Sequence, residues 1–260
     1  MRIAVVQTDP VFGEIEKNVQ NALALMQSAE ADLYVLPELF NTGYNFVDAE
    51  EANRLSESTS GYTFEEIAAF ARRQSCYVVY GFVENTLKLY NSASLVGPYG
   101  MMGLYRKVHL FNRENLFFAP GDLGFPVFNL PIGKIGIMIC FDWYYPESAR
   151  TLALKGAQIV CHPSNLVLPH CPDAMVTRCL ENHIFAATSN RIGVEDRGGV
   201  EFSFIGKSEI VTPKGEIVQR LGSEAPGIAV AEVDLHDADN KQLNQFNNLI
   251  AGRRPSQYSL

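Results

Sequence analysis

The sequence lacks three features that would each point to a particular class of protein. It contains no apolar run of the roughly 18 residues that a membrane span requires. Its 21 lysines and arginines are outnumbered by 29 aspartates and glutamates, which argues against nucleic acid as a partner, because phosphate binding relies on a basic surface. The N-terminal stretch MRIAVVQTDP enters a strand pattern at once and has no signal-peptide pattern, so we expect a cytoplasmic protein without a membrane partner.

Cysteine is present, but not in a pattern that indicates disulfides or a metal site. The five cysteines are an odd number in a chain large enough to bury a core without cross-links, which favours free thiols in a reducing compartment. A zinc site could be assembled from His170, Cys171, Cys179 and His183. These residues lack the paired CxxC spacing that makes such predictions strong, so we expect no metal.

Short apolar runs bounded by Pro, Gly and Asn alternate with amphipathic stretches, a pattern typical of strands and helices layered on one another. Strands are predicted at residues 3–7, 33–37, 77–82, 92–97, 104–110, 135–140, 158–162, 185–190, 207–213 and 228–235. Helices are predicted at residues 15–30, 63–74, 146–156, 173–183 and 237–247. No Ser- or Gly-rich linker and no charge block divides the chain. We therefore expect a single α/β domain over residues 1–260.

Two segments, ADLYVLPE (31–38) and AQIVCHPS (157–164), share the frame Ala, polar, four mostly apolar residues, Pro, polar. Each follows a predicted strand and a predicted helix. Two interpretations are open. The first is a duplicated strand–helix–strand unit, which gives two similar halves packed against each other. The second is two independent buried strands that each end in a proline turn.

Three side chains capable of chemistry lie in or at the ends of predicted strands. Glu38 follows LYVLP, Lys107 lies inside LYRKVHL, and Cys140 follows IGIMI. Strand ends of α/β sheets are where sites form, and glutamate and lysine are seldom fully buried unless paired. Singly, each has a structural explanation: a solvent-facing carboxylate, a half-exposed strand beside Arg106 and His109, and an inert buried thiol. Only the set of three indicates a reaction.

The segments VLPELFNTGY around Glu38, GLYRKVHLF around Lys107 and GIMICFDWYYPESAR around Cys140 resemble the three signature segments of the nitrilase, or carbon–nitrogen hydrolase, superfamily, in the same order. The resemblance continues through PGD (120–122), KGAQIVCHPSN, LENHIFAATSNR and RRPSQY, and so covers essentially the whole chain. It implies a four-layer α-β-β-α sandwich of two mixed sheets flanked by helices, as in compact single-domain archaeal and bacterial homologues. It also implies pairing with a second subunit through helices, so we expect a homodimer or a higher homo-oligomer.

The same resemblance implies a cysteine-dependent hydrolase that needs no metal or organic cofactor. A thiol is a good nucleophile only as the thiolate, so a positioned base activates it. As in the family, Glu38 would deprotonate Cys140, while Lys107 and the backbone N–H of Phe141 would hold the oxyanion. Glu114 matches a second family glutamate that orients the lysine and the substrate. Its alternative is a solvent-exposed loop residue.

Tyr44, Trp143 and Asn165 closely follow the signature segments, so each is a candidate for the substrate pocket, with a core aromatic or a turn asparagine as the alternative. The expected substrate is a small amide, cleaved through a thioester with release of ammonia. The sequence Phe-Asp-Trp after Cys140 looks more like the amidase and carbamoylase branches than many nitrilases. Small aliphatic nitriles and N-carbamoyl amines or amino acids stay open. Two further alternatives are a Cys–His hydrolase, for which no histidine is singled out, and a non-catalytic interaction module of the same fold.

Overall fold

Two six-stranded sheets form the centre of the protein in the computed structural model, which describes residues 1–258; the last two residues of the predicted domain lie outside this range. The first sheet has the order β14 (Gly227–Glu232), β1 (Arg2–Gln7), β2 (Leu33–Val35), β3 (Tyr77–Asn85), β4 (Leu89–Gly97), β5 (Gly100–Arg106). The second has the order β13 (Ile217–Arg220), β12 (Glu209–Val211), β9 (Phe185–Ser189), β8 (Ile159–Pro163), β7 (Gly133–Ile137), β6 (Val127–Leu130).

The two sheets have the same pattern of strand pairing. Starting from β14 in one sheet and from β6 in the other, successive pairs are antiparallel, parallel, parallel, antiparallel and antiparallel. Helix α1 (Ile15–Gln27) connects the parallel strands β1 and β2, and α5 (Pro146–Leu154) connects the parallel strands β7 and β8. The two similar segments fall on β2 and β8. This arrangement favours the duplicated unit over two independent strands.

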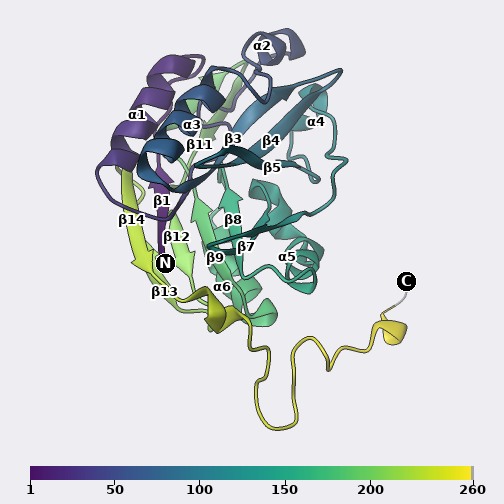
Figure 1. The fold of residues 1–260 in the computed structure, drawn as a ribbon. Coiled ribbons are helices and arrows are strands. Elements are labelled where there is room, and N and C mark those ends of the chain that lie inside the picture. Colours follow the sequence, from purple (N-terminus) through teal and green to yellow (C-terminus); the bar gives the residue numbers. More distant parts are fainter. Residues whose placement is uncertain (259–260) are drawn as a thin grey trace.

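The sheets pack face to face with helices outside them, which confirms the predicted four-layer order (Figure 1). Val5, Val35 and Ile137 belong to the buried core shared by the two sheets. Helices α1 and α3 (Tyr62–Gln74) cover the outer face of the first sheet. Helices α5 and α6 (Cys171–Asn182) lie against the second sheet. The remaining elements are α2 (Ala49–Arg54), α4 (Glu114–Phe117), the hairpin β10 (Val194–Arg197) and β11 (Val200–Ser203), and the 3-10 turns η1 (Cys140–Tyr144), η2 (Leu235–Ala238) and η3 (Pro255–Gln257).

The long helices follow the apolar periodicity of the sequence. Helix α1 buries Val19, Leu23 and Met26 on one face, because residues spaced by three or four positions share a side of a helix. Pro146 is the first residue of α5, where a missing N–H leaves no helical hydrogen bond unmade. In residues 1–258 no helix is long and apolar enough to cross a membrane.

The predicted helix at residues 237–247 is wrong. Only η2 forms there, and the chain beyond it extends away from the sandwich (Figure 1). Asparagine side chains bind the backbone that a helix would need: Asn240 Oδ1 accepts the N–H of Gln242 at 3.0 Å, and Asn244 Oδ1 accepts that of Phe246 at 2.9 Å. Such local bonds compete with helix formation.

The two predicted strands that were expected to contain Lys107 and Cys140 end before these residues. The strand predicted at 104–110 ends at Arg106, so Lys107 lies just beyond β5 and not inside a strand. The backbone N–H of Val108 donates to the Tyr105 hydroxyl, and that of His109 donates to the carboxylate of Asp142, which takes both groups away from a strand ladder. The strand predicted at 135–140 ends at Ile137.

Gly81 in β3 lies against the backbone that carries Glu38. A Cβ atom on Gly81 would be 2.6 Å from Glu38 Cα and 2.8 Å from Leu39 N. Because backbone atoms cannot rotate away, the chain itself would have to shift. We expect Gly81→Ala to lower the free energy of unfolding by about 1–3 kcal/mol, the usual effect of overpacking, as measured by urea unfolding.

Gly222 provides the control for this substitution. It is exposed, and no atom lies within 4 Å of the position of its Cβ. Gly222→Ala is therefore expected to change the free energy of unfolding by less than about 0.5 kcal/mol. Equal effects of the two substitutions would contradict the close approach of β3 to Glu38.

Candidate active site

Cys140 lies at a sharp bend where β7 gives way to η1. Its φ of 40° is in the left-handed region, which a residue with a Cβ atom rarely adopts and which costs about 1–3 kcal/mol. The side chain is only 5% exposed. Surrounding bonds must therefore hold this backbone in place.

The carboxylate of Asp142 supplies several of these bonds. It accepts the N–H of Ile139 at 2.9 Å and the hydroxyl of Tyr105 at 2.6 Å. Its other oxygen accepts from the backbone N–H of His109 at 3.1 Å and from His109 Nδ1 at 2.8 Å. Asp142 thus ties the Cys140 bend to the segment that follows β5.

His162 in β8 holds the other side of the bend. Its Nε2 donates to the carbonyl oxygen of Cys140 at 2.9 Å, and its Nδ1 is 3.1 Å from the Thr188 hydroxyl. Burial lowers the pKa of His162 to about 4, so the ring is neutral near pH 7. A neutral imidazole with both nitrogens bonded acts here as a fixed strut, not as a base for Cys140.

Three charged side chains form a buried cluster. Lys107 Nζ donates to Glu38 Oε1 at 2.6 Å and to Glu114 Oε1 at 2.7 Å. Glu38 Oε1 also accepts from Asn91 Nδ2 at 2.6 Å, whereas Glu38 Oε2 has no hydrogen-bond partner among residues 1–258. None of the three charged residues is more than 3% exposed. Glu38 comes from the end of β2, Lys107 from the end of β5 and Glu114 from the start of α4.

Burial and charge shift the pKa values in this cluster. Burial raises the pKa of Glu114 to about 7, against the opposing effect of Lys107. Burial alone would lower the pKa of Lys107, but the carboxylates of Glu114 and Glu38 outweigh it and raise that pKa above the ordinary lysine value. Burial, then the charge of Glu38, raise the pKa of Cys140 well above the usual range for a thiol. The resting cysteine is therefore protonated, and it reacts as a nucleophile only if a neighbouring group takes the proton.

The predicted site residues form two adjoining groups. Cys140, Phe141, Trp143 and Asn165 line one small cavity together with Phe111, Leu166, Val167 and Leu168. Both amide atoms of Asn165, a residue 2% exposed, lack a partner among residues 1–258. Tyr44 lies in the second group, because its hydroxyl donates to Glu114 Oε1 at 2.6 Å. The charges of Glu38, Lys107 and Glu114 act on Cys140, so the two groups belong to one site.

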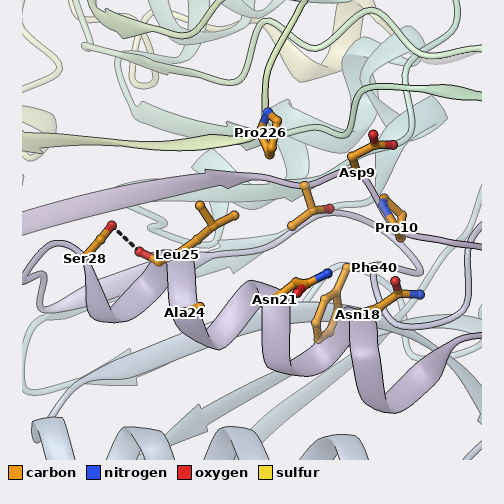
Figure 2. A pocket seen from close by; sticks show the side chains of 10 residues that line it. Asp9, Pro10, Asn18, Asn21, Ala24, Leu25, Ser28, Phe40 and Pro226 are labelled. Carbon is orange, nitrogen blue, oxygen red and sulfur yellow. Dashed lines mark hydrogen bonds between the residues drawn. The ribbon is translucent and has the colours of Figure 1, made fainter.

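A more spacious cavity lies elsewhere. It has a volume of about 350 Å³ and is bounded by the side of α1 that faces Pro226, by Pro226 itself and by the segment after β1 (Figure 2). The polar side chains there are those of Thr8, Asp9, Asn18, Asn21 and Ser28, which include no nucleophile paired with a base. The cavity beside Cys140 is only about 20 Å³, but its lining includes Cys140, the thiol on which the charged cluster acts. Chemistry, not volume, locates the site.

The sequence interpretation missed several supporting residues. Asp142 lies two residues after Cys140, and His162 precedes the proline of the second repeated segment. Both are polar residues within apolar stretches of sequence, and this pattern could have indicated that they are buried and hydrogen-bonded. Asn91 in β4 gave no signal beyond its position at the start of a strand. For the zinc alternative, no group of three metal-ligating side chains is found in residues 1–258.

Comparison with known proteins identifies the family of this chain. The family model for carbon–nitrogen hydrolases matches residues 2–241. A protein named nitrilase from Pyrococcus abyssi is 46% identical over 263 residues, which cover 99% of each chain. A solved carbon–nitrogen hydrolase from Helicobacter pylori G27 has a TM-score of 0.86 at 26% identity, over 92% of this chain and 90% of that one.

A second solved structure carries direct chemical information about its own protein. An amidase from Nesterenkonia sp. AN1, with acrylamide added to its active-site cysteine, has a TM-score of 0.77 at 27% identity, over 93% of this chain and 96% of that one. The TM-score shows that it shares the fold found here, two mixed sheets flanked by helices. With a family match over nearly the whole chain and a relative 46% identical along its full length, this chain belongs to the carbon–nitrogen hydrolase family and is a nitrilase-type hydrolase.

Proposed function

We propose that this hydrolase cleaves small aliphatic amides through a thioester on Cys140 and releases ammonia. The observation that carries the proposal is the buried Glu38–Lys107–Glu114 cluster beside Cys140. A base, a cation and a thiol buried together have the properties that amide cleavage by a cysteine requires. The non-catalytic alternative offers no reason to bury three charges next to a thiol.

In the first step the sulfur of Cys140 bonds to the amide carbon while its proton moves to Glu38. Because the buried thiol is protonated at rest, its attack requires a base, and Glu38 Oε2 has no hydrogen-bond partner among residues 1–258 that would compete for the proton. The carbonyl electrons move onto oxygen, and the Lys107 ammonium and the N–H of Phe141 hold the resulting oxyanion. Phe141 lies in the first turn of η1, where N–H groups have no intrahelical acceptor.

The carbon–nitrogen bond then breaks as Glu38 returns the proton to the leaving nitrogen, so ammonia departs and a thioester remains. Glu38 next takes a proton from water, whose oxygen bonds to the thioester carbon. The carbon–sulfur bond breaks, the proton returns from Glu38 to the sulfur, and a carboxylic acid is released. Glu114 and Tyr44 do not exchange protons in this scheme; they hold Lys107 in place.

The lining of the Cys140 cavity favours a small, uncharged acyl group. Phe111, Trp143 and Leu166 contribute apolar surface, and the eight lining residues include no charged side chain. A substrate with a carboxylate would leave that charge without a partner, which is unfavourable away from water. Asn165 contributes a buried amide that has no hydrogen-bond partner among residues 1–258 and can bind the polar end of the substrate. These features favour simple amides over N-carbamoyl amino acids.

Small aliphatic nitriles are the second candidate. The Pyrococcus relative at 46% identity is named a nitrilase, and attack of a thiol on a nitrile carbon uses the same groups. Amides and nitriles share the first attack and differ only in how the intermediate collapses. The site residues therefore do not distinguish them, and both are tested in one assay.

The proposal includes a homodimer in the cytoplasm. Tyr144, Leu154 and Leu180 are exposed on or next to α5 and α6, and a second subunit that covers them would remove apolar surface from water. The five cysteines are free, in keeping with a reducing compartment. Size-exclusion chromatography with light scattering measures the mass of the assembly.

The central test measures ammonia release from a panel of small amides, ω-amides, N-carbamoyl compounds and nitriles. We expect turnover to be greatest with short neutral amides and Cys140→Ala to abolish it, because the nucleophile is gone. Mass spectrometry of the wild-type enzyme during turnover should detect an acyl adduct on Cys140.

Cys179→Ala is the matched control, since Cys179 is also a buried thiol but lies on α6 outside the site. It should retain full activity. No turnover of any compound, or equal turnover by wild type and Cys140→Ala, would overturn the proposal.

The pH profile tests the role of Glu114. Its pKa is raised to about 7, so protonation below that pH removes an anion that binds Lys107. We expect kcat/KM to fall as pH drops through about 7. Glu114→Gln removes this titration, so the acid limb should move to lower pH, and the plateau should fall about ten- to a hundredfold through loss of a charged hydrogen bond.

Glu209 serves as the control for this profile. It is fully buried in β12 with a pKa also raised to about 7, but it pairs with Arg220 and not with Lys107. Glu209→Gln should leave the acid limb in place. An acid limb that is the same in wild type and Glu114→Gln would rule out Glu114 as its source.

A further inference from the structure

A second buried ion pair is connected to the charged cluster through Tyr44. Arg191 Nη1 donates to Glu195 Oε1, and the two residues are 1% and 5% exposed. Arg191 follows β9, and Glu195 lies in β10. Neither residue lines the cavity beside Cys140. A buried ion pair contributes little net stability on average, because the cost of desolvation offsets much of the attraction. The other hydrogen bonds of the two residues therefore indicate their role.

The carboxylate of Glu195 binds the backbone of the segment that contains Tyr44. Glu195 Oε2 accepts the N–H of Tyr44 at 3.1 Å and that of Asn45 at 2.7 Å. Gly43 permits this approach: its φ is 82°, and a Cβ atom there would be 2.7 Å from Glu195 Oε1. The glycine, the two N–H groups and the carboxylate together form a fitted contact.

Arg191 fixes the carboxylate from the other side. Its guanidinium donates to the carbonyl oxygen of Ile192 at 3.1 Å and to that of Pro10 at 3.3 Å, and it lies 4.0 Å from the centre of the Phe204 ring. The planar guanidinium is therefore held by the backbone and by an aromatic face. Glu195 pairs with a cation that is itself immobile.

These contacts determine where the Tyr44 side chain points. Its ring packs edge to face on Phe202 and on Phe204, with ring centres 5.5 and 6.0 Å away. Its hydroxyl donates to Glu114 Oε1, the same oxygen that accepts from Lys107 Nζ at 2.7 Å. The backbone end of Tyr44 is thus bound to Glu195, its ring to aromatic neighbours, and its hydroxyl to Glu114.

We propose that Arg191 and Glu195 are positioning residues for the reaction, which set the Tyr44 hydroxyl against Glu114 and thereby fix the Lys107 ammonium. They do not touch the substrate and act only through Tyr44. This inference rests on the proposed function, in which Lys107 holds the oxyanion. The ion pair with Arg191 holds the Glu195 carboxylate in one position. The N–H groups of Tyr44 and Asn45 that bind this carboxylate are therefore held in place as well.

The test is a double-mutant cycle between Glu195→Gln and Tyr44→Phe. We expect Glu195→Gln to lower kcat/KM about tenfold in the wild-type background, as for loss of a charged hydrogen bond. In the Tyr44→Phe background, where no hydroxyl reaches Glu114, it should lower kcat/KM by less than about twofold. Glu209→Gln, which removes an unrelated buried carboxylate, should lower kcat/KM equally little in both backgrounds.

The pH profile adds a readout that a merely structural role would not move. Glu114 faces Lys107, Glu38 and Tyr44, and the Tyr44 hydroxyl bond lowers the pKa of Glu114. Loss of that bond raises the pKa, so both Tyr44→Phe and Glu195→Gln should move the acid limb to higher pH. Glu209→Gln should leave it unmoved.

A second variant covers the case in which Glu195→Gln fails to fold. Replacing both charges by apolar residues, Arg191→Met with Glu195→Leu, avoids an unpaired buried charge but leaves the N–H groups of Tyr44 and Asn45 without an acceptor. It should fold, move the acid limb upward and lower kcat/KM. The positioning role would be overturned if the losses of kcat/KM in the cycle were additive. It would also be overturned if the acid limb stayed in place in both Glu195→Gln and the double variant. Absence of any turnover by wild type would instead overturn the proposed function.

Discussion

The buried ammonium of Lys107 between two carboxylates is the interaction on which the rest of the site depends. A lone cation or carboxylate at this depth would lose its hydration without compensation. The cluster is therefore possible only if the ends of β2 and β5 and the start of α4 meet. Burial, and after it the charge of Glu38, raise the pKa of the Cys140 thiol against the opposing effect of Lys107, so the resting thiol is protonated. The fold and the chemistry are coupled through this one arrangement.

The repeated pairing pattern of the two sheets explains how the groups come together. Strand β2 in one sheet corresponds to β8 in the other, so Glu38 after β2 and Ser164 after β8 occupy equivalent positions. Only one half carries the carboxylate, and only β7 leads into a cysteine. A duplicated scaffold thus serves one site, with the second half supplying struts such as His162 against the Cys140 carbonyl.

Around this centre, buried polar groups hold strained or charged parts in place. Asp142 binds the bend that contains Cys140, whose φ is positive. Arg191 and Glu195 bind the segment that contains Tyr44. Each carboxylate satisfies backbone N–H groups that would otherwise be buried without partners. Rigid residues around the site hold the reactive groups within the narrow range of distances and angles that the reaction needs.

The sequence by itself determined the α/β class and most helices and strands, because apolar periodicity is a local signal. The four-layer order and the choice of Glu38, Lys107 and Cys140 as a catalytic set followed from the resemblance of whole segments to a family. The structure brings Lys107 into contact with Glu38, and the catalytic roles of the three residues belong to the proposal. The sequence-based prediction failed at residues 237–247, where asparagine side chains bind the backbone and no α-helix forms. Only the tertiary structure decided that Tyr44 meets Glu114 and that Glu195 meets Tyr44, residues 70 and 151 positions apart. Contacts over such separations depend on how whole sheets and loops pack, and no spacing along the chain encodes them.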